Sequence, residues 1–151
     1  MAQRAAGTFT GIALGGVNIA GERFRGGQVG LINWCCDGNA AWADRSAGAQ
    51  LGLVNYAGSF CGLQSGLANV TDGAFAGLQD GLVNCAGNMY GVQCGFYFLF
   101  GINVAQGNVR GCQMGLVNFA ETMDCGLQIG LLNFITNDGW LPVLPIVNGN
   151  F

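Results

Sequence analysis

The chain has 151 residues, enough to bury one sizeable core, and 51% of them are hydrophobic, which excludes a disordered protein. Charge is sparse: five arginines, no lysine, no histidine and eight acidic residues give a net charge of -3. This composition supplies no basic patch for nucleic acid or for an anionic membrane surface. Twenty-eight glycines without the three-residue period of collagen indicate a structural role in a repeat.

One repeat, G-x-Q-x-G-L-x-N, runs through most of the chain. Its copies begin at Gly11, Gly26, Gly48, Gly62, Gly77, Gly91, Gly111 and Gly126. The unit is too short for a helical repeat, and two glycines in eight residues would cost a helix about 1 kcal/mol each. We therefore expect an all-β fold in a single domain, residues 1–151, with repeat copies from 11 to 133 and a closing segment at 134–151.

The spacing of the amide side chains predicts how the strands connect. In regular copies the next Gln follows each Asn by 9 or 10 residues, a gap that contains turn residues and suits a β-hairpin. Carboxamides opposite one another can satisfy each other's hydrogen bonds in a partly buried setting. The expected pairs are Asn55 with Gln64, Asn69 with Gln79, Asn84 with Gln93, and Asn118 with Gln128. Independent turn and ladder amides are the alternative.

The second glycine of each copy predicts a bend. Residues of both parities after it are apolar, as in Leu131-Leu132, so the chain there either turns into the next strand or closely approaches another backbone.

Two insertions interrupt the pattern. The first lengthens the gap between Asn33 and Gln50 and is expected at a hairpin tip.

The second insertion is the most hydrophobic stretch of the chain, and it falls at the glycine bend. It consists of Phe96, Tyr97, Phe98, Leu99 and Phe100. Such a segment can plug a central cavity, meet a partner or face lipid, and the alternative is one longer core strand.

The closing segment differs from the repeats. Pro142 and Pro145 cannot occupy central ladder positions, so we expect an edge or closing strand. In this interpretation, the core left open by the last repeat is capped by Trp140, Leu144, Ile146 and Phe151.

Three architectures accommodate such a unit. Our main expectation is a ring or shallow barrel of β-hairpin petals with pseudo-rotational symmetry, its glycine bends near the axis. The alternatives are a parallel β-solenoid with one coil per repeat and an eight-stranded membrane β-barrel. The solenoid would stack the glutamines and asparagines, but we expect it to hold coil length more constant than this sequence does.

The GLQxGLxN units and the LPVLPIVN ending resemble those of bacterial surface-repeat proteins, and they are similar to what is expected of the β-flower fold. The similarity covers about residues 11–151. It implies a petal ring and a cell-envelope setting, and it implies no catalytic residues. The interrupted copy at Gly91 departs from the pattern. The start of the chain shows no clear signal peptide, so the localisation rests on the resemblance alone.

The sequence contains few candidate residues for catalysis or metal binding. Without histidine or lysine, general-base and Schiff-base catalysis lack their usual residues, and Asp80 is the one acidic residue within a repeat copy. The seven cysteines form no CxxC motif. Cys94 and Cys112 occupy repeat positions that hold Leu, Ile, Ser or Met in other copies and are interpreted as small apolar filler, whereas Cys35 and Cys36 are expected to be exposed. We expect no enzyme, no metal site and no cofactor.

These observations favour a non-enzymatic structural or binding module, with an apolar small molecule or lipid lined by residues 96–100 and Trp140. A membrane-inserted β-barrel or small pore is the alternative, so membrane association is among the expected properties. No run reaches the roughly 18 apolar residues of a membrane-spanning helix. The sequence does not fix the oligomeric state.

Overall fold

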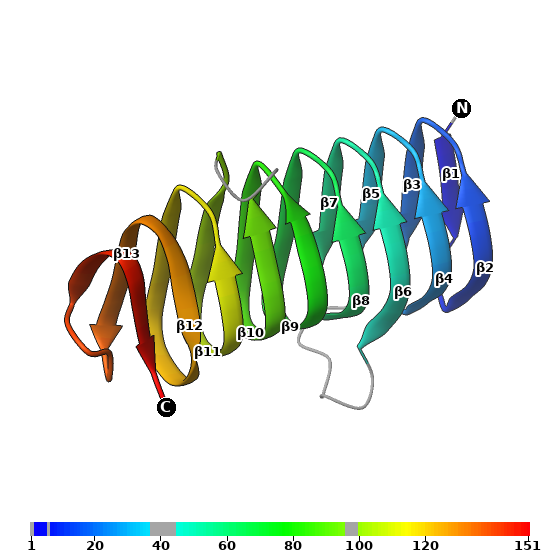
Figure 1. The fold of residues 1–151 in the computed structure, drawn as a ribbon. Helices are drawn as coiled ribbons and strands as arrows, with labels where there is room; N and C mark the ends of the chain where they lie inside the picture. The colour runs from blue at the N-terminus through cyan, green and yellow to red at the C-terminus, as the bar shows by residue number, and fades with distance from the viewer. Residues whose placement is uncertain (1, 6, 37–44, 96–99) are drawn as a thin grey trace.

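The protein is a parallel β-solenoid in its computed structural model, which describes residues 2–5, 7–36, 45–95 and 100–151 (Figure 1). The chain makes about 7 turns, and each turn adds a strand segment to each of two facing sheets. The strands in chain order are β1 (Ala2–Ala5), β2 (Phe9–Leu14), β3 (Val17–Ala20), β4 (Phe24–Val29), β5 (Ile32–Cys35), β6 (Ser46–Leu51), β7 (Val54–Ala57), β8 (Phe60–Ser65), β9 (Ala68–Gly81), β10 (Val83–Gly95), β11 (Ile102–Met114), β12 (Val117–Asn137) and β13 (Val143–Asn150).

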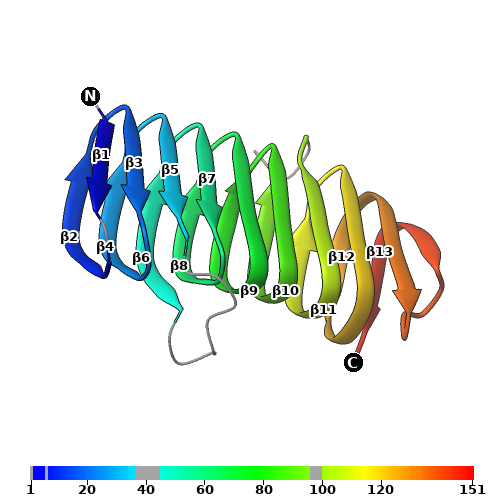
Figure 2. The same ribbon diagram turned by 180° about the vertical axis from the view of Figure 1, so that it is seen from behind.

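The two sheets carry different halves of the repeat. In the glutamine sheet, β2, β4, β6 and β8 pair in parallel, so that Gln28, Gln50 and Gln64 lie side by side. In the asparagine sheet, β1, β3, β5 and β7 do the same (Figure 2). From β9 onward, one long strand per turn bends around the lower edge of Figure 1 and supplies both sheets.

Both glycines of the repeat are required because neighbouring coils approach closely. A Cβ on Gly26 would lie 1.9 Å from the carbonyl oxygen of Gly11, and Gly26 has φ of +136°, a conformation that side-chain-bearing residues rarely adopt. At the second glycine, a Cβ on Gly30 would lie 2.1 Å from the oxygen of Gly15 and 2.7 Å from Nδ2 of Asn18. The second glycine is therefore both the bend and the close approach that the sequence predicts, and it makes room for the asparagine of the preceding coil.

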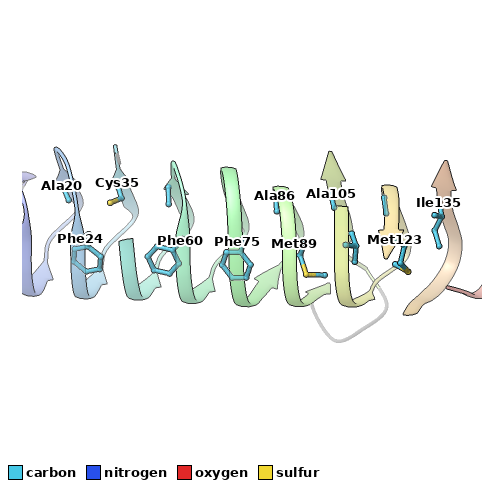
Figure 3. Packing of buried hydrophobic residues seen from close by; sticks show 13 residues of the cluster. Ala20, Phe24, Cys35, Phe60, Phe75, Ala86, Met89, Ala105, Met123 and Ile135 are labelled. Carbon is cyan, nitrogen blue, oxygen red and sulfur yellow. The ribbon is translucent and has the colours of Figure 1, made fainter. Parts of the chain in front are cut away.

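The lower half of the solenoid has an apolar interior (Figure 3). One column from the glutamine sheet contains Phe24, Phe60, Phe75, Met89, Val109 and Met123. The facing column from the asparagine sheet contains Ala20, Cys35, Ala57, Ala86, Ala105, Ala120 and Ile135. Large residues thus meet small ones across the coil, which fills the space between the sheets.

The upper half has a polar interior made of two amide ladders. Each asparagine donates from Nδ2 to Oδ1 of the next one along the chain, at 2.7–2.9 Å, in the series Asn18, Asn33, Asn55, Asn69, Asn84, Asn103, Asn118 and Asn133. Each glutamine donates from Nε2 to Oε1 of the previous one, at 2.7–2.8 Å, in the series Gln28, Gln50, Gln64, Gln79, Gln93, Gln113 and Gln128. All of these side chains are fully or almost fully buried.

The second N–H of most ladder amides donates to a backbone carbonyl. Asn69 donates to the oxygen of Asp80 at 2.9 Å, and Gln79 donates to the oxygen of Cys85 at 3.2 Å. Among the ladder amides of the described chain, the buried atoms without a partner are the acceptors at one end of each ladder, Oδ1 of Asn18 and Oε1 of Gln128. The ladders therefore satisfy nearly all of their buried polar atoms.

The expected ring of hairpins is wrong, and the solenoid alternative is correct. The predicted pairs of Asn55 with Gln64, Asn69 with Gln79, Asn84 with Gln93, and Asn118 with Gln128 do not form, because asparagine pairs with asparagine and glutamine with glutamine. Asn118 and Gln128 lie in the same strand, β12, on opposite sheets. The 9 or 10 residues between them pass around the lower edge within one coil.

Unequal repeat lengths do not disturb the solenoid, contrary to our expectation. After the first insertion, Gln28 still pairs with Gln50 and Asn33 with Asn55, since the extra residues enter at a turn. Residues 37–44 of that insertion lie outside the described residues. The second insertion enters at the opposite turn, and Gln93 still pairs with Gln113.

The C-terminal end is closed by β13, which pairs with β12 in the antiparallel direction. It has no second strand neighbour among the described strands, so the edge position expected from Pro142 and Pro145 is confirmed. The expected apolar cap is wrong: Trp140, Ile146 and Phe151 are exposed, and Leu144 is only half-buried. Ile135 ends the core instead, with Gly139 of the following turn packed close to its side chain.

Candidate binding surface

The outer surface of the upper half is apolar. Because side chains alternate along a strand, each buried asparagine places its two neighbours outside. In the asparagine sheet, the residues before each asparagine form a row of Val17, Ile32, Val54, Ala68, Val83, Ile102, Val117 and Leu132. The parallel register makes this row continuous along the solenoid, at about 4.8 Å per coil.

A second apolar row follows the turns of the upper edge in Figures 1 and 2, which we call the glycine-leucine edge. In most copies a leucine directly follows the second glycine, and the row contains Leu31, Leu53, Leu67, Leu82, Leu116 and Leu131. Their exposed fractions range from 38% to 62%. Within the described chain, these turns contain no charged side chain, and the charged residue beside them is Asp80, which directly precedes the turn at Gly81-Leu82; the edge is therefore mainly apolar.

Charged residues gather at the opposite, lower edge, which we call the charged edge. It contains Glu22, Arg23, Arg25, Arg45, Asp72, Arg110, Glu121 and Asp124. Arg110 and Asp124 form an ion pair at 2.7 Å. The backbone N–H of Asp124 donates to Oδ1 of Asn108 at 3.1 Å. The pKa of Asp124 is lowered by the side chain of Asn108 first and by Arg110 second.

Of the predicted apolar-ligand residues, the structure describes only Phe100 and Trp140. Phe96, Tyr97, Phe98 and Leu99 lie outside the described residues. Phe100 ends the insertion at the glycine-leucine edge with 68% of its surface exposed. Trp140 instead packs on Phe151 at the C-terminal end, with ring centroids 5.6 Å apart. Among the described residues, the coil interior holds buried amides and core side chains.

The exposed apolar rows are not among the predictions from the sequence, although their pattern is present in it. Leucine recurs after the second glycine, and a β-branched residue recurs before the asparagine, in most copies. These positions looked like a core because residues of both parities were apolar. The structure places them outside because the amides occupy the interior.

The seven cysteines lie in different environments. All seven lie in the described part of the chain and form no disulfide. Cys36 is exposed as expected, whereas the expectation for Cys35 is wrong, because it is buried with Sγ 2.8 Å from Oγ of Ser46. Burial raises the pKa of Cys112, and burial followed by Asp80 and Cys112 raises the pKa of Cys94. A raised pKa lowers the thiolate fraction that nucleophilic catalysis needs.

Across the described residues, no group of three or more Cys, Asp or Glu side chains is arranged to hold a metal ion. No helix long and apolar enough to cross a membrane is found in the part of the chain that the structure describes.

Three comparisons with known proteins return nothing: no family model, no curated protein and no solved structure matches this chain.

Proposed function

We propose that the protein is a non-enzymatic structural or binding module that lies on a lipid surface through its glycine-leucine edge. The observation that carries this proposal is the segregation of side chains between the two edges. Leu31, Leu53 and Leu131 are 58%, 49% and 62% exposed on one edge, whereas most charged side chains of the described chain lie at or near the other, with Asp80 as an exception. A straight, uncharged apolar row of this length has the chemistry of the hydrocarbon boundary of a lipid layer.

The charge balance favours an apolar mode of lipid binding over an electrostatic one. The net charge is -3, and Arg23, Arg25, Arg45 and Arg110 lie away from the glycine-leucine edge. Binding should therefore depend on buried apolar area and not on anionic headgroups, whose attraction for basic residues is about 1 kcal/mol each. Phe100, exposed at the same edge, adds to the apolar area.

A non-enzymatic role is supported by the residues available for catalysis. The chain contains no histidine and no lysine, and burial raises the pKa of the thiols of Cys85, Cys94 and Cys112. The resemblance of the repeats to bacterial surface-repeat proteins supports a lipid surface of the cell envelope.

The proposal is tested by flotation with vesicles of uncharged phosphatidylcholine. We expect the protein to float with the vesicles at low and high salt alike. Replacing Leu53 and Leu67 together with aspartate should weaken binding at least about tenfold, since two carboxylates would have to enter the apolar boundary.

The matched control replaces Leu63 and Leu78 with aspartate. These two leucines also lie side by side in neighbouring coils, and they are at least partly exposed on the outer face of the glutamine sheet, away from the turns of the glycine-leucine edge. This variant should float as the unmodified protein does. Absence of flotation, or equal losses in the two double variants, would contradict the proposal.

A further inference from the structure

Three sulfur-containing side chains lie together on the outer face of the glutamine sheet, in the neighbouring strands β10 and β11. Cys94 pairs in register with Met114, and Cys112 precedes Met114 by two residues in β11. Cys112 and Met114 flank the fully buried Gln113, so the alternation of side chains along a strand places both outside. Cys94 directly follows a ladder glutamine and lies outside for the same reason. All three side chains are partly buried and still accessible from this face.

The two thiols are too far apart for a disulfide and close enough to share an ion. Cys94 and Cys112 lie in adjacent parallel strands and are offset by two residues in register. A strand spacing of about 4.8 Å and a rise of about 3.3 Å per residue then separate their Cα atoms by about 8 Å. A disulfide requires about 4.4–6.8 Å between Cα atoms, and both thiols are free. Two metal–thiolate bonds of about 2.3 Å each place the sulfur atoms up to about 4.6 Å apart, which the two side chains reach when they turn toward one another.

The charges around Cys94 favour a cation. In β9, on the other side of Cys94, its partner in register is Asp80. Burial first, then the negative charge of Asp80, and then that of Cys112 raise the pKa of Cys94. The same negative charges that oppose a thiolate at Cys94 attract a cation, and a bound cation deprotonates a coordinating thiol outright.

The setting of Cys125 is different, although its register is similar. Cys125 lies in the strand on the other side of Cys112 and is also offset from it by two residues. Its partner in register is Arg110, and the neighbouring carboxylate of Asp124 already pairs with that guanidinium at 2.7 Å. The negative charge that favours a cation at Cys94 is therefore neutralised at Cys125.

The ligand set selects a soft ion of low coordination number. Structural Zn²⁺ sites are almost always four-coordinate, and the described residues contain no group of three or more Cys, Asp or Glu side chains arranged for a metal ion. Thiolate and thioether sulfur together suit Cu(I). Val92 and Leu127 lie on either side of Cys112 in register, and such apolar neighbours limit the access of water to a bound ion.

We propose that Cys94 and Cys112 bind one Cu(I) ion through their thiolates, with the thioether of Met114 as a third ligand. Binding releases the two thiol protons to solvent and changes the oxidation state of neither copper nor sulfur. The site lies on the outer face of the glutamine sheet and requires no lipid, so it is independent of the function proposed above.

Competition with the chromogenic Cu(I) chelator bicinchoninate tests the site, with oxygen excluded and ascorbate present to keep copper reduced. We expect the unmodified protein to withdraw one equivalent of Cu(I) from the chelator complex. Cys94→Ser should raise the dissociation constant for Cu(I) at least about 100-fold, because a neutral hydroxyl replaces a soft thiolate ligand. The matched control Cys125→Ser removes a thiol from the next coil and should leave the dissociation constant unchanged. Circular dichroism should be the same for both variants, since both side chains lie on the outside.

The thioether is tested separately with Met114→Leu, which keeps the size of the side chain and removes its sulfur. We expect this variant to bind Cu(I) about tenfold more weakly. X-ray absorption spectroscopy should show three sulfur neighbours around copper in the unmodified protein and two in Met114→Leu.

Each part of the proposal has a result that would overturn it. Failure of the unmodified protein to withdraw Cu(I), or equal losses in Cys94→Ser and Cys125→Ser, would overturn the site. Equal affinity of Met114→Leu and the unmodified protein would overturn the thioether ligand. Binding of Zn²⁺ as tight as that of Cu(I), with the same loss in Cys94→Ser, would overturn the choice of ion.

Discussion

The upper and lower halves of each coil reverse the usual relation between inside and outside. In the upper half, the interior contains buried amides such as Asn84, and the exterior contains exposed leucines such as Leu53. In the lower half, the interior contains Phe75 and its neighbours, and the exterior contains the charged edge. The difference shows that register, and not hydrophobicity alone, selects what is buried. An amide can be fully buried when an identical amide stacks on it from each neighbouring coil.

The largest expected effect on stability concerns the first glycine of the repeat, which lies where the upper and lower halves of the coil meet. Gly26 lies between Phe24 of the apolar interior and Gln28 of the amide ladder. Gly26→Ala should lower the free energy of unfolding by at least about 4 kcal/mol, because the Cβ would meet the oxygen of Gly11 at 1.9 Å in a backbone of positive φ.

Gly27→Ala is the control for this change. A Cβ there would meet Ile12 at 3.9 Å, which is an ordinary contact. Its effect should stay within about 0.5 kcal/mol in urea denaturation. Equal destabilisation by Gly26→Ala and Gly27→Ala would show that the close approach of neighbouring coils is not the reason why the first glycine is required.

Reciprocal substitutions in β10 test whether the upper half requires buried amides and the lower half buried apolar side chains. Asn84→Leu leaves Nδ2 of Asn69 and Oδ1 of Asn103 without their ladder partner, and it should cost about 3 kcal/mol. Met89→Asn places an unpaired amide in the apolar half and should cost about as much. If Asn84→Leu stabilised the protein in urea denaturation, the amide ladder would be dispensable and the upper half an ordinary core position.

A smaller effect is expected in thiol reactivity. At neutral pH, Cys94 and Cys112 should be alkylated by iodoacetamide several-fold more slowly than the exposed Cys125. The reason is that the pKa of the Cys94 thiol and that of the Cys112 thiol are both raised, which lowers the fraction of reactive thiolate. Mass spectrometry of timed samples gives the three rates. Unfolding in urea should bring the rates together, and rapid labelling of folded Cys94 would reopen the case for a reactive thiol.

The smallest effect concerns the charged edge. The pKa of Asp124 is lowered from 3.8 by Asn108 and Arg110, so its stabilisation is present above 3.8 and is lost as the pH falls through the lower folded value. Asp124→Asn should remove this part of the acid sensitivity in thermal melts below pH 4. The change should be slight because both partners are exposed.

Much of the fold follows from the repeat, but its connectivity does not. Two glycines in eight residues exclude a helix, and the second glycine has the bend and close approach expected of it. The spacing from Asn118 to Gln128 fits a strand that returns as a hairpin and also one that continues around a corner. Chain distance alone cannot separate these, because the pairing depends on the neighbouring coil. The apolar rows were missed for the same reason: a row forms only after coils are stacked in register.

The opposite directions of the two amide ladders have an electrostatic consequence. Asparagine amides donate toward the C-terminus and glutamine amides toward the N-terminus, as in Asn69 to Asn84 and Gln79 to Gln64. Each amide carries a dipole of about 3.5 D, so a single ladder would build a growing axial dipole with every coil. Two opposed ladders cancel this sum coil by coil. Adding or deleting a coil therefore leaves the axial field nearly unchanged, and the length of such a solenoid can vary without an electrostatic penalty.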